Sequence, residues 1–290
     1  MVLEADNFSE KIVSFARGHY FFRKESEMDL SLAGKTVIVT GGGSNIGRAI
    51  SLTFAREGAN LVVAELKADF GEKVVQEANA LKAGGRSMVI ETDVTKVEAA
   101  EALAKKTMDE FGRIDVLVNN VGWDVQMLFT ETTPDFWDKV IDINYKGVLN
   151  CTKAVLPHMI EQKSGAIVSI GSDAGRMGEF KEAVYGGCKG AVIAFTKAVA
   201  RETGRYGIRL NVVCPGMTVP ADEEIGSGSM WQVTKAQFTP EIIEKAAKSY
   251  ALRRVGKAQE VANAVVFLAS DAASFITGQT LSASGGYTMM

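Results

Sequence analysis

Short apolar runs rich in β-branched residues alternate with helical patterns from Lys35 to the end of the chain. The runs predict strands at Thr36–Thr40, Leu61–Ala64, Ser87–Thr92, Val116–Asn119, Ala166–Ile170, Ile208–Val213 and Thr280–Ser282. Helical spacing between them predicts helices that reach about Gly58, Gly84 and Gly112, followed by helices at Phe136–Lys163, Val184–Tyr206 and Gln259–Ala269. Such alternation requires right-handed crossovers between parallel strands. The pattern therefore predicts an α/β fold, a single doubly wound parallel sheet with helices on both faces.

The first 30 residues do not follow this alternation. Phe8, Ile12 and Phe15 fall at helical spacing, and a charged stretch from Arg23 to Asp29 follows. Two interpretations stay open: an amphipathic helix that docks on the domain or on a second subunit, or a wrongly assigned start with translation beginning at Met28. Residues 31–290 are expected to form one domain, because the alternation is unbroken to the C-terminus.

Composition excludes several classes of function. The 290 residues are 47% hydrophobic, and 32 basic against 35 acidic residues give a net charge of −3, which argues against nucleic acid as the main partner. Three widely spaced cysteines rule out a disulfide framework and fit a reducing cytoplasm. Two histidines are too few for a histidine-rich metal site, so no metal is expected. No apolar run approaches the roughly 18 residues of a membrane span.

A glycine-rich stretch from Thr40 to Gly47 follows the first predicted strand and opens the first helix. Glycines at this point let the backbone approach a pyrophosphate, and the helix N-terminus supplies N–H donors. Glu65 ends the second strand, where a carboxylate accepts hydrogen bonds from ribose hydroxyls and repels a 2′-phosphate. Asp93–Val94 and Asn119–Gly122 end the next two strands. These features predict a Rossmann-type site that binds NAD(H).

Tyr185 and Lys189 are four residues apart in a predicted helix, so they share one helical face. A nearby ammonium stabilises a phenolate, and such a tyrosine can take a proton from an alcohol while hydride leaves for the nicotinamide. Ser172 follows a strand and could orient the substrate oxygen, and Asn144 lies inside the long helix. Each has a plain structural alternative: a surface pair for Tyr185 and Lys189, a cap for Ser172 and a packed polar group for Asn144.

Together these motifs make the chain resemble the short-chain dehydrogenase/reductase family from Ala33 to Met290. The collinear matches are Thr40–Gly47, Asp93, Asn119–Gly122, Asn144, Ser172, Tyr185, Lys189, Pro215-Gly216, Thr277-Gly278-Gln279 and Gly285-Gly286. The resemblance implies Tyr185 as acid/base, Lys189 on the nicotinamide ribose, Ser172 on the substrate oxygen and Asn144 holding a relay water. It also implies a homotetramer. The residues expected to bind the cofactor are Gly41, Ser44, Asn45, Ile46, Gly47, Glu65, Asp93, Val94, Asn120, Gly122, Tyr185, Lys189, Pro215, Gly216 and Thr218.

The chain departs from the family pattern at three places. The middle glycine of the glycine-rich turn is Asn45, which tolerates left-handed backbone better than most residues. Val121 replaces an alanine. Pro220 stands where the family often has a threonine that contacts the nicotinamide carboxamide, while Thr218 lies two residues earlier. Which residue meets the carboxamide is therefore open.

Residues 217–250 correspond to the family's substrate lid. Here the segment carries acids at Asp222–Glu224, flexible glycines and Met230-Trp231. The stretches around Trp123, Arg176 and Tyr185 resemble family members that oxidise alicyclic β-hydroxyacyl-CoA thioesters, such as 2-hydroxycyclohexanecarboxyl-CoA dehydrogenases. On that resemblance Trp123 and Trp231 would enclose the acyl group, and Arg176 or Lys181 would meet CoA phosphates.

Other substrates and one other class of protein remain open. A 3-oxoacyl thioester, a small secondary alcohol or a sugar would suit the same catalytic residues. A non-catalytic cofactor-binding subunit or redox sensor on this fold would be expected to lose Tyr185 or Lys189. Because both are present, an enzyme is the favoured interpretation.

Overall fold

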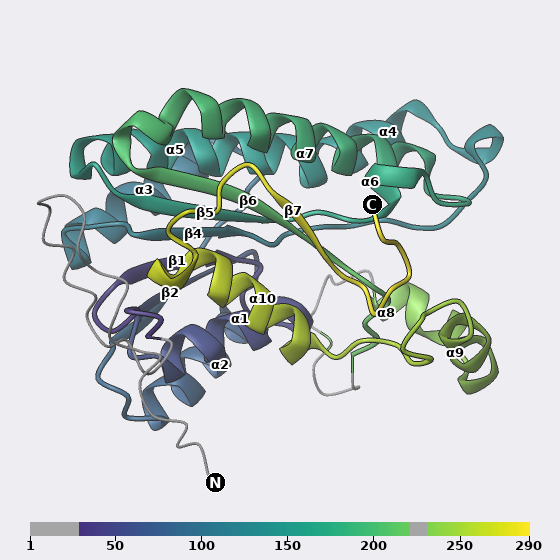
Figure 1. Cartoon of the computed structure of the whole chain (residues 1–290), viewed down its shortest axis with the longest axis horizontal. Helices are drawn as coiled ribbons and strands as arrows, with labels where there is room; N and C mark the ends of the chain where they lie inside the picture. The colour runs from purple at the N-terminus through teal and green to yellow at the C-terminus, as the bar shows by residue number, and fades with distance from the viewer. Residues whose placement is uncertain (1–28, 221–224, 226–230) are drawn as a thin grey trace, which may run out of the picture.

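The protein is built on a parallel sheet of seven strands in the order β3-β2-β1-β4-β5-β6-β7 (Figure 1). The computed structural model describes residues 29–220, 225 and 231–290. The strands are β1 (Thr36–Thr40), β2 (Asn60–Glu65), β3 (Ser87–Glu91), β4 (Val116–Asn119), β5 (Gly165–Ile170), β6 (Ile208–Pro215) and β7 (Thr280–Ala283). The predicted doubly wound α/β fold is confirmed.

Helices cover both faces of the sheet (Figure 1). One face carries α1 (Asn45–Arg56), α2 (Ala68–Ala80) and α10 (Ala258–Ala269), and the other carries α3 (Val97–Phe111), α5 (Gly147–Gln162) and α7 (Ala183–Thr203). Successive side chains of β1 point alternately into two hydrophobic cores, one on each face of the sheet. Val37 and Val39 pack toward α1 and α10, whereas Ile38 packs toward α3 and α5. This alternation explains why the strands of a sheet covered on both faces read as continuous apolar runs.

The long helix expected over Phe136–Lys163 is three consecutive segments. They are α4 (Pro134–Ile141), a π-helical turn at Asp142–Lys146, and α5. The turn gives the helix a wider winding, and the Asn144 amide donates to the Val140 carbonyl at 2.9 Å. Immediately afterwards Gly147 lies against the β3–α3 connection, where an added Cβ would come within 2.8 Å of Val94 Cγ2. Apolar periodicity alone does not reveal such a local change of winding.

The stretch after β6, expected to be irregular, contains short helices. These are α8 (Trp231–Thr234) and α9 (Pro240–Ala247), with another short helix, α6 (Ala174–Met177), after β5. Thr239 caps α9 by accepting the Ile242 N–H at 3.4 Å, and Pro240 takes the first helical position. The acids Asp222–Glu224 and Met230 of the expected lid lie outside the described residues.

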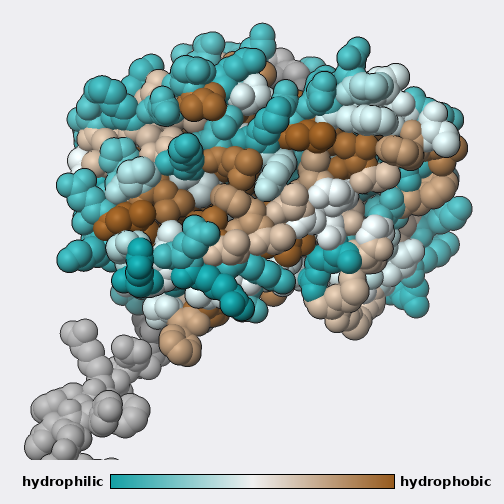
Figure 2. All heavy atoms as spheres, turned by 90° about the horizontal axis from the view of Figure 1, so that it is seen from above, coloured by the Kyte–Doolittle hydropathy of each residue, from teal (hydrophilic) through white to brown (hydrophobic). Residues whose placement is uncertain are grey.

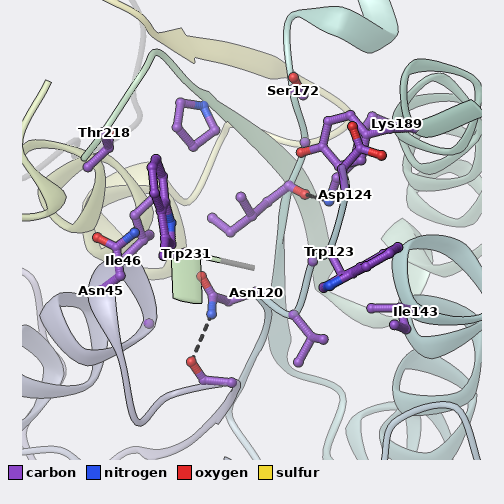
Figure 3. A pocket seen from close by; sticks show the side chains of 18 of the residues that line it. Asn45, Ile46, Asn120, Trp123, Asp124, Ile143, Ser172, Lys189, Thr218 and Trp231 are labelled. Carbon is purple, nitrogen blue, oxygen red and sulfur yellow. Dashed lines mark hydrogen bonds between the residues drawn. The ribbon is translucent and has the colours of Figure 1, made fainter. Parts of the chain in front are cut away.

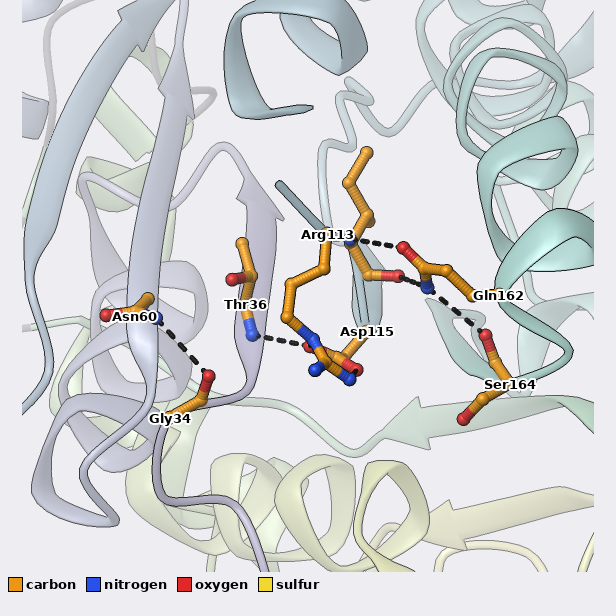
Figure 4. A network of polar contacts seen from close by, with 8 residues as sticks. Gly34, Thr36, Asn60, Arg113, Asp115, Gln162 and Ser164 are labelled. Carbon is orange, nitrogen blue, oxygen red and sulfur yellow. Dashed lines mark hydrogen bonds and ion pairs between the residues drawn. The ribbon is translucent and has the colours of Figure 1, made fainter. Parts of the chain in front are cut away.

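A polar network ties together the amino-terminal ends of the central strands (Figure 4). Asp115 is only 4% exposed, accepts the Thr36 N–H at 2.8 Å and binds the Arg113 guanidinium through both carboxylate oxygens. Gln162 of α5 exchanges hydrogen bonds with the backbone of Ile114. These contacts fix the amino edge of the sheet, opposite the edge at which the candidate site opens.

The described chain begins beside the sheet rather than apart from it. Leu32 is 3% exposed in the core cluster of α1 and α10, and the Leu30 carbonyl accepts the Asp271 N–H at 3.3 Å. The apolar positions Phe8, Ile12 and Phe15 lie outside the described residues. In the part of the chain that is described, no helix is both long and apolar enough to cross a bilayer.

Candidate active site

A cavity of about 730 Å³ opens at the carboxyl ends of the strands. It begins beside β1, which pairs with β2 on one side and with β4 on the other. The chain connections on the two sides of β1 therefore run in opposite directions along the sheet. Open α/β sheets bind ligands at such a switch point. All of the predicted cofactor residues line this one cavity: Gly41, Ser44, Asn45, Ile46, Gly47, Glu65, Asp93, Val94, Asn120, Gly122, Tyr185, Lys189, Pro215, Gly216 and Thr218.

The glycine-rich turn leaves no room for side chains. Gly41 has a φ of +60°, which favours glycine, and a Cβ on Gly47 would come within 1.9 Å of the Gly41 carbonyl oxygen. Asn45 replaces the family's middle glycine and has a φ of +41°, in the left-handed region that asparagine tolerates. The turn therefore keeps the close-approach geometry despite this substitution.

Two carboxyl groups and an amide hold the neighbouring loops in place. Glu65 accepts the Gly43 N–H and the Leu66 N–H, both at 3.0 Å, so its carboxylate lies against the glycine-rich turn. Asp93 accepts the Thr95 backbone and hydroxyl donors at 3.0 and 2.7 Å. Asn120 donates to the carbonyls of Thr40 and Gly41 at 3.0 Å each, which joins the end of β4 to the turn after β1.

These residues fit a dinucleotide. The Asn45 side-chain oxygen is buried and has no hydrogen-bond partner among the described residues, which suits a site completed by a ligand donor. The turn offers backbone where side chains would block a pyrophosphate, and Glu65 stands at the end of β2 where ribose hydroxyls would lie. Within the described residues, no group of three or more histidine, cysteine, aspartate or glutamate side chains could hold a metal ion.

Tyr185, Ser172 and Lys189 meet at the far end of the same cavity (Figure 3). Tyr185 and Lys189 project from α7, and Ser172 follows β5. The Tyr185 phenol lies near enough to the Ser172 hydroxyl for that group to lower its pKa. The Lys189 ammonium donates to the Ile170 carbonyl at 2.8 Å and lies 5.4 Å from the centre of the Tyr185 ring. The predicted surface-pair alternative is wrong, because Lys189 is only 2% exposed.

The electrostatics of this group oppose ionisation of the phenol. Burial raises the pKa of Tyr185, the negative charges of Glu182 and Asp124 raise it further, and the neighbouring Ser172 hydroxyl lowers it. Burial also lowers the pKa of Lys189 to about 8. Without a further positive charge, Tyr185 is a protonated phenol at neutral pH.

Asn144 lies behind the cavity rather than in its lining. It is fully buried at the π-helical turn, and its side chain both donates to the Trp123 carbonyl at 2.7 Å and accepts the Trp123 N–H at 3.1 Å. The third contact is the bond to Val140 described above. Asn144 therefore fixes the chain that leaves β4 against the helical layer. Its expected role in holding a relay water remains a prediction.

The three predicted substrate residues have different environments. Trp123 lines the cavity, with its ring centre 5.9 Å from that of Phe136 and the Lys139 ammonium 3.8 Å above it. Trp231 also lines the cavity, but Figure 3 draws it on the side of Asn45 and Ile46, across from Ser172.

Arg176 has partners within the protein, and its contact with CoA phosphates stays a prediction. Its side chain is 15% exposed, donates to the Ser282 hydroxyl of β7 at 2.7 Å and lies 3.7 Å from the Asp173 carboxylate. Arg176 and Lys181 are absent from the cavity lining. The closeness of Arg176 to Ser172 in the sequence does not reveal that Ser282, on a strand far away in the sequence, will bind its side chain.

The segment after β6 closes another side of the cavity. The Tyr250 hydroxyl accepts the Met217 N–H at 2.8 Å, and a Cβ on Gly216 would come within 2.9 Å of the Tyr250 ring. Thr218 lines the cavity, whereas Pro220 does not. This geometry favours Thr218 as the residue available to a nicotinamide carboxamide.

Sequence reasoning missed an acidic side of the cavity. Asp124, Glu179 and Glu182 line it near Tyr185, together with Tyr287. Asp124 follows Trp123 directly after a central strand, a position that could have drawn attention to it. The contribution of Glu179 and Glu182 depends on how the loop before α7 folds back, which no local pattern predicts.

Comparisons with known proteins agree with this geometry. A family model described as enoyl-(acyl carrier protein) reductase matches residues 41–288. The 3-oxoacyl-(acyl-carrier-protein) reductase of Staphylococcus epidermidis is 38% identical, over 88% of this chain and 99% of its own. An uncharacterized oxidoreductase of Thermotoga maritima is 34% identical, over 89% of this chain and 99% of its own.

Solved structures show the same likeness. A 7α-hydroxysteroid dehydrogenase in complex with NADH and 7-oxo glycochenodeoxycholic acid is 32% identical. It superposes with a TM-score of 0.81, covering 89% of this chain and 96% of that one.

Proposed function

The chain belongs to the short-chain dehydrogenase/reductase family, and we propose that it transfers hydride between NAD(H) and the 3-oxo or 3-hydroxy group of an acyl thioester. Membership in the family makes it an oxidoreductase of keto and hydroxy groups that uses a nicotinamide cofactor. The observation that carries the proposal is the grouping of Tyr185, Ser172 and Lys189 in the cavity that also contains the glycine-rich turn. A non-catalytic subunit would have no need to keep this group.

The side chains of the site divide the work of ketone reduction. Ser172 and the Tyr185 phenol both donate toward the substrate carbonyl oxygen, which polarises the carbonyl and orients it. Bound reduced nicotinamide supplies the hydride that reaches the carbonyl carbon. Tyr185 gives its proton to the oxygen as the new C–H bond forms, and the resulting phenolate is reprotonated from solvent. The Lys189 ammonium stabilises that phenolate while it lasts.

The electrostatics of the site favour the reductive direction. A general acid must be protonated before the reaction, and the raised pKa of Tyr185 keeps its proton in place throughout the neutral range. Oxidation of an alcohol needs the phenolate instead. Its formation requires the positive charges of Lys189 and of oxidised nicotinamide to outweigh burial and the charges of Glu182 and Asp124.

Two kinds of support point to an acyl thioester. The curated relatives include 3-oxoacyl-(acyl-carrier-protein) reductases at 38% identity over nearly their whole length. Trp123 lines the cavity and Phe136 packs beside its ring, which suits a bulky or ring-bearing acyl group such as the alicyclic β-hydroxyacyl-CoA substrates suggested by the resemblance. Glu65 supports NAD(H), because its carboxylate would oppose a 2′-phosphate.

The test is a matched set of substrates, followed by the change in NADH absorbance. It compares an acetoacetyl thioester on CoA with the same acyl group on acyl carrier protein, alongside 2-oxocyclohexanecarboxyl-CoA, 2-pentanone and a ketose. Reduction of the thioesters with the highest kcat/KM supports the proposal, and the two carriers distinguish CoA from acyl carrier protein. A higher kcat/KM for 2-pentanone or the ketose would reject it.

A further inference from the structure

Asp124 is a buried acid at the active site for which the reduction described above has no role. It is 6% exposed, and its Oδ2 oxygen has no hydrogen-bond partner among the described residues. The carboxyl group lies beside Ser172 and Lys189 in the cavity (Figure 3). A buried polar atom that faces a cavity without a partner indicates a contact that the ligand completes.

The groups around Asp124 do not neutralise its charge. Glu182, in the loop before α7, and Tyr185 and Cys188, on α7, interact with its charge. The Lys189 ammonium on the same helix donates to the Ile170 carbonyl, and Glu182 accepts the Gln126 amide at 2.8 Å. No described cation forms an ion pair with Asp124. The repulsion between two neighbouring carboxylates that have no cation beside them is reduced most simply when one of them is protonated.

We propose that Asp124 acts in its neutral form and donates a hydrogen bond to the second carbonyl oxygen of the substrate, selecting esters and thioesters over free 3-oxo acids. The inference rests on the proposed function, since a 3-oxoacyl thioester carries two carbonyl groups separated by one carbon. Tyr185 and Ser172 take the reacting oxygen. Asp124 lines the same cavity as Tyr185 and Ser172 and has an unpartnered oxygen, so we assign it to the second carbonyl oxygen of the substrate.

The same acid explains why a free acid would be rejected. A free 3-oxo acid puts a carboxylate where the thioester has a neutral carbonyl, so it faces the negative charge of Glu182, and that of Asp124 wherever this carboxyl group is ionised. Like-charge contacts of this kind cost enough to lower kcat/KM by at least about tenfold. Asp124 is therefore a specificity-determining residue as well as a hydrogen-bond donor.

The acidity of the group fits this role. Burial, and after it the charge of Glu182, raises the pKa of Asp124 to about 7. A substantial fraction is then neutral at neutral pH. Substrate binding removes further water from the cavity and favours the neutral form more strongly.

The experiment compares reduction of acetoacetate, ethyl acetoacetate and 2-pentanone by the wild-type protein, Asp124→Asn and Asp124→Ala. Asp135→Asn, an exposed acid on α4, is the matched control. The ethyl ester probes the second carbonyl without CoA phosphates, and 2-pentanone has no second carbonyl. NADH binding, followed by fluorescence, checks that each variant keeps its cofactor site.

The inference predicts that the wild-type protein favours the ester over acetoacetate by at least about tenfold. Asp124→Ala should lose about tenfold more on the ester than on 2-pentanone, and Asp124→Asn should restore most of that loss, because an amide also donates. Asp124→Asn should also lower the ratio of kcat/KM for the ester to kcat/KM for acetoacetate. Reduction of the ester by the wild-type protein should decline above about pH 7, as the carboxyl group ionises, and the decline should be absent in Asp124→Asn.

Three results would overturn the inference. The Asn variant could keep the full preference against acetoacetate, the Ala variant could slow 2-pentanone as much as the ester, or the wild-type protein could prefer the free acid. If the Ala variant does not fold, the Asn variant and the pH profile still decide. Failure of the proposed function differs from these: the wild-type protein would then reduce 2-pentanone but neither the ester nor an acetoacetyl thioester, which rejects both ideas.

Discussion

At the residue scale, the Glu65 carboxylate both contacts the glycine-rich turn and stands where the adenosine ribose is expected. Its carboxylate accepts two backbone N–H groups, which holds it beside the glycine-rich turn, and it occupies the end of β2 where the adenosine ribose would lie. The nearby Arg48, which could otherwise attract a 2′-phosphate, forms an ion pair with Glu77. The choice between NAD and NADP therefore depends mainly on the charge of Glu65.

Glu65→Gln keeps the shape of the side chain and removes its charge. We expect the ratio of kcat/KM for NADPH to that for NADH to rise roughly tenfold to a hundredfold, as a like-charge contact with the 2′-phosphate is lost. Glu72→Gln, an exposed change on α2, should leave the ratio unaltered. An unchanged ratio in Glu65→Gln, or a wild-type preference for NADPH, would show that another group discriminates between the two cofactors at the ribose.

The sequence predicted some site residues far better than others. Tyr185 and Lys189 are fixed by their spacing on one helix, and the glycine-rich turn by its place after the first strand, so local rules suffice for them. The hydrogen bond from Arg176 to Ser282 was not predicted, because Ser282 lies on the last strand, far away in the sequence. Asp124 was missed because its raised pKa arises first from burial and then from the charge of Glu182, and both depend on how the chain folds.

At the element scale, the π-helical turn between α4 and α5 links packing to the site. It carries Asn144, whose amide holds both the carbonyl and the N–H of Trp123. Trp123 leads directly into Asp124, so this clamp positions the side of the cavity that contains the unpartnered carboxyl group. Hydrophobic periodicity predicted one uninterrupted helix here, since a single wider turn changes the apolar pattern too little to be read.

Asn144→Ala removes three side-chain hydrogen bonds to backbone and leaves buried groups without partners. We expect the free energy of unfolding to fall by about 1–3 kcal/mol, measured by urea denaturation. NADH should still bind, because the glycine-rich turn does not contact Asn144, but kcat should decrease as Trp123 and Asp124 lose their position. Asn79→Ala on the exposed side of α2 is the control, and a stability loss equal to that of the control would contradict the clamp.

At the scale of the whole molecule, the described chain packs into the domain from Leu30 onward. Leu30 and Leu32 already connect the start of the described chain to α1, α10 and the turn after it. The implied homotetramer stays a prediction. Figure 2 views the face that carries α5 and α7, where hydrophobic patches are interspersed among hydrophilic side chains, as a face covered by another subunit would require.

A chain beginning at Met28 tests the two interpretations of the N-terminal segment. We expect it to keep the melting temperature, the sedimentation behaviour and the activity of the full chain, because the contacts of Leu30 and Leu32 are retained. A lower melting temperature or a smaller oligomer would instead favour a docking helix formed around Phe8, Ile12 and Phe15. The full chain, measured in the same buffer and at the same concentration, is the reference.

The most direct test of the account is the rate at which Tyr185→Phe reduces an acetoacetyl thioester with NADH, compared with the wild-type protein and with Tyr206→Phe. The substitution removes only the hydroxyl that donates the proton. We predict that kcat falls by about 10²–10⁴-fold, while NADH affinity and the rate of Tyr206→Phe stay within a few-fold of the wild-type values. A kcat for Tyr185→Phe within a few-fold of the wild-type value would contradict the account, because the proton would then come from another group.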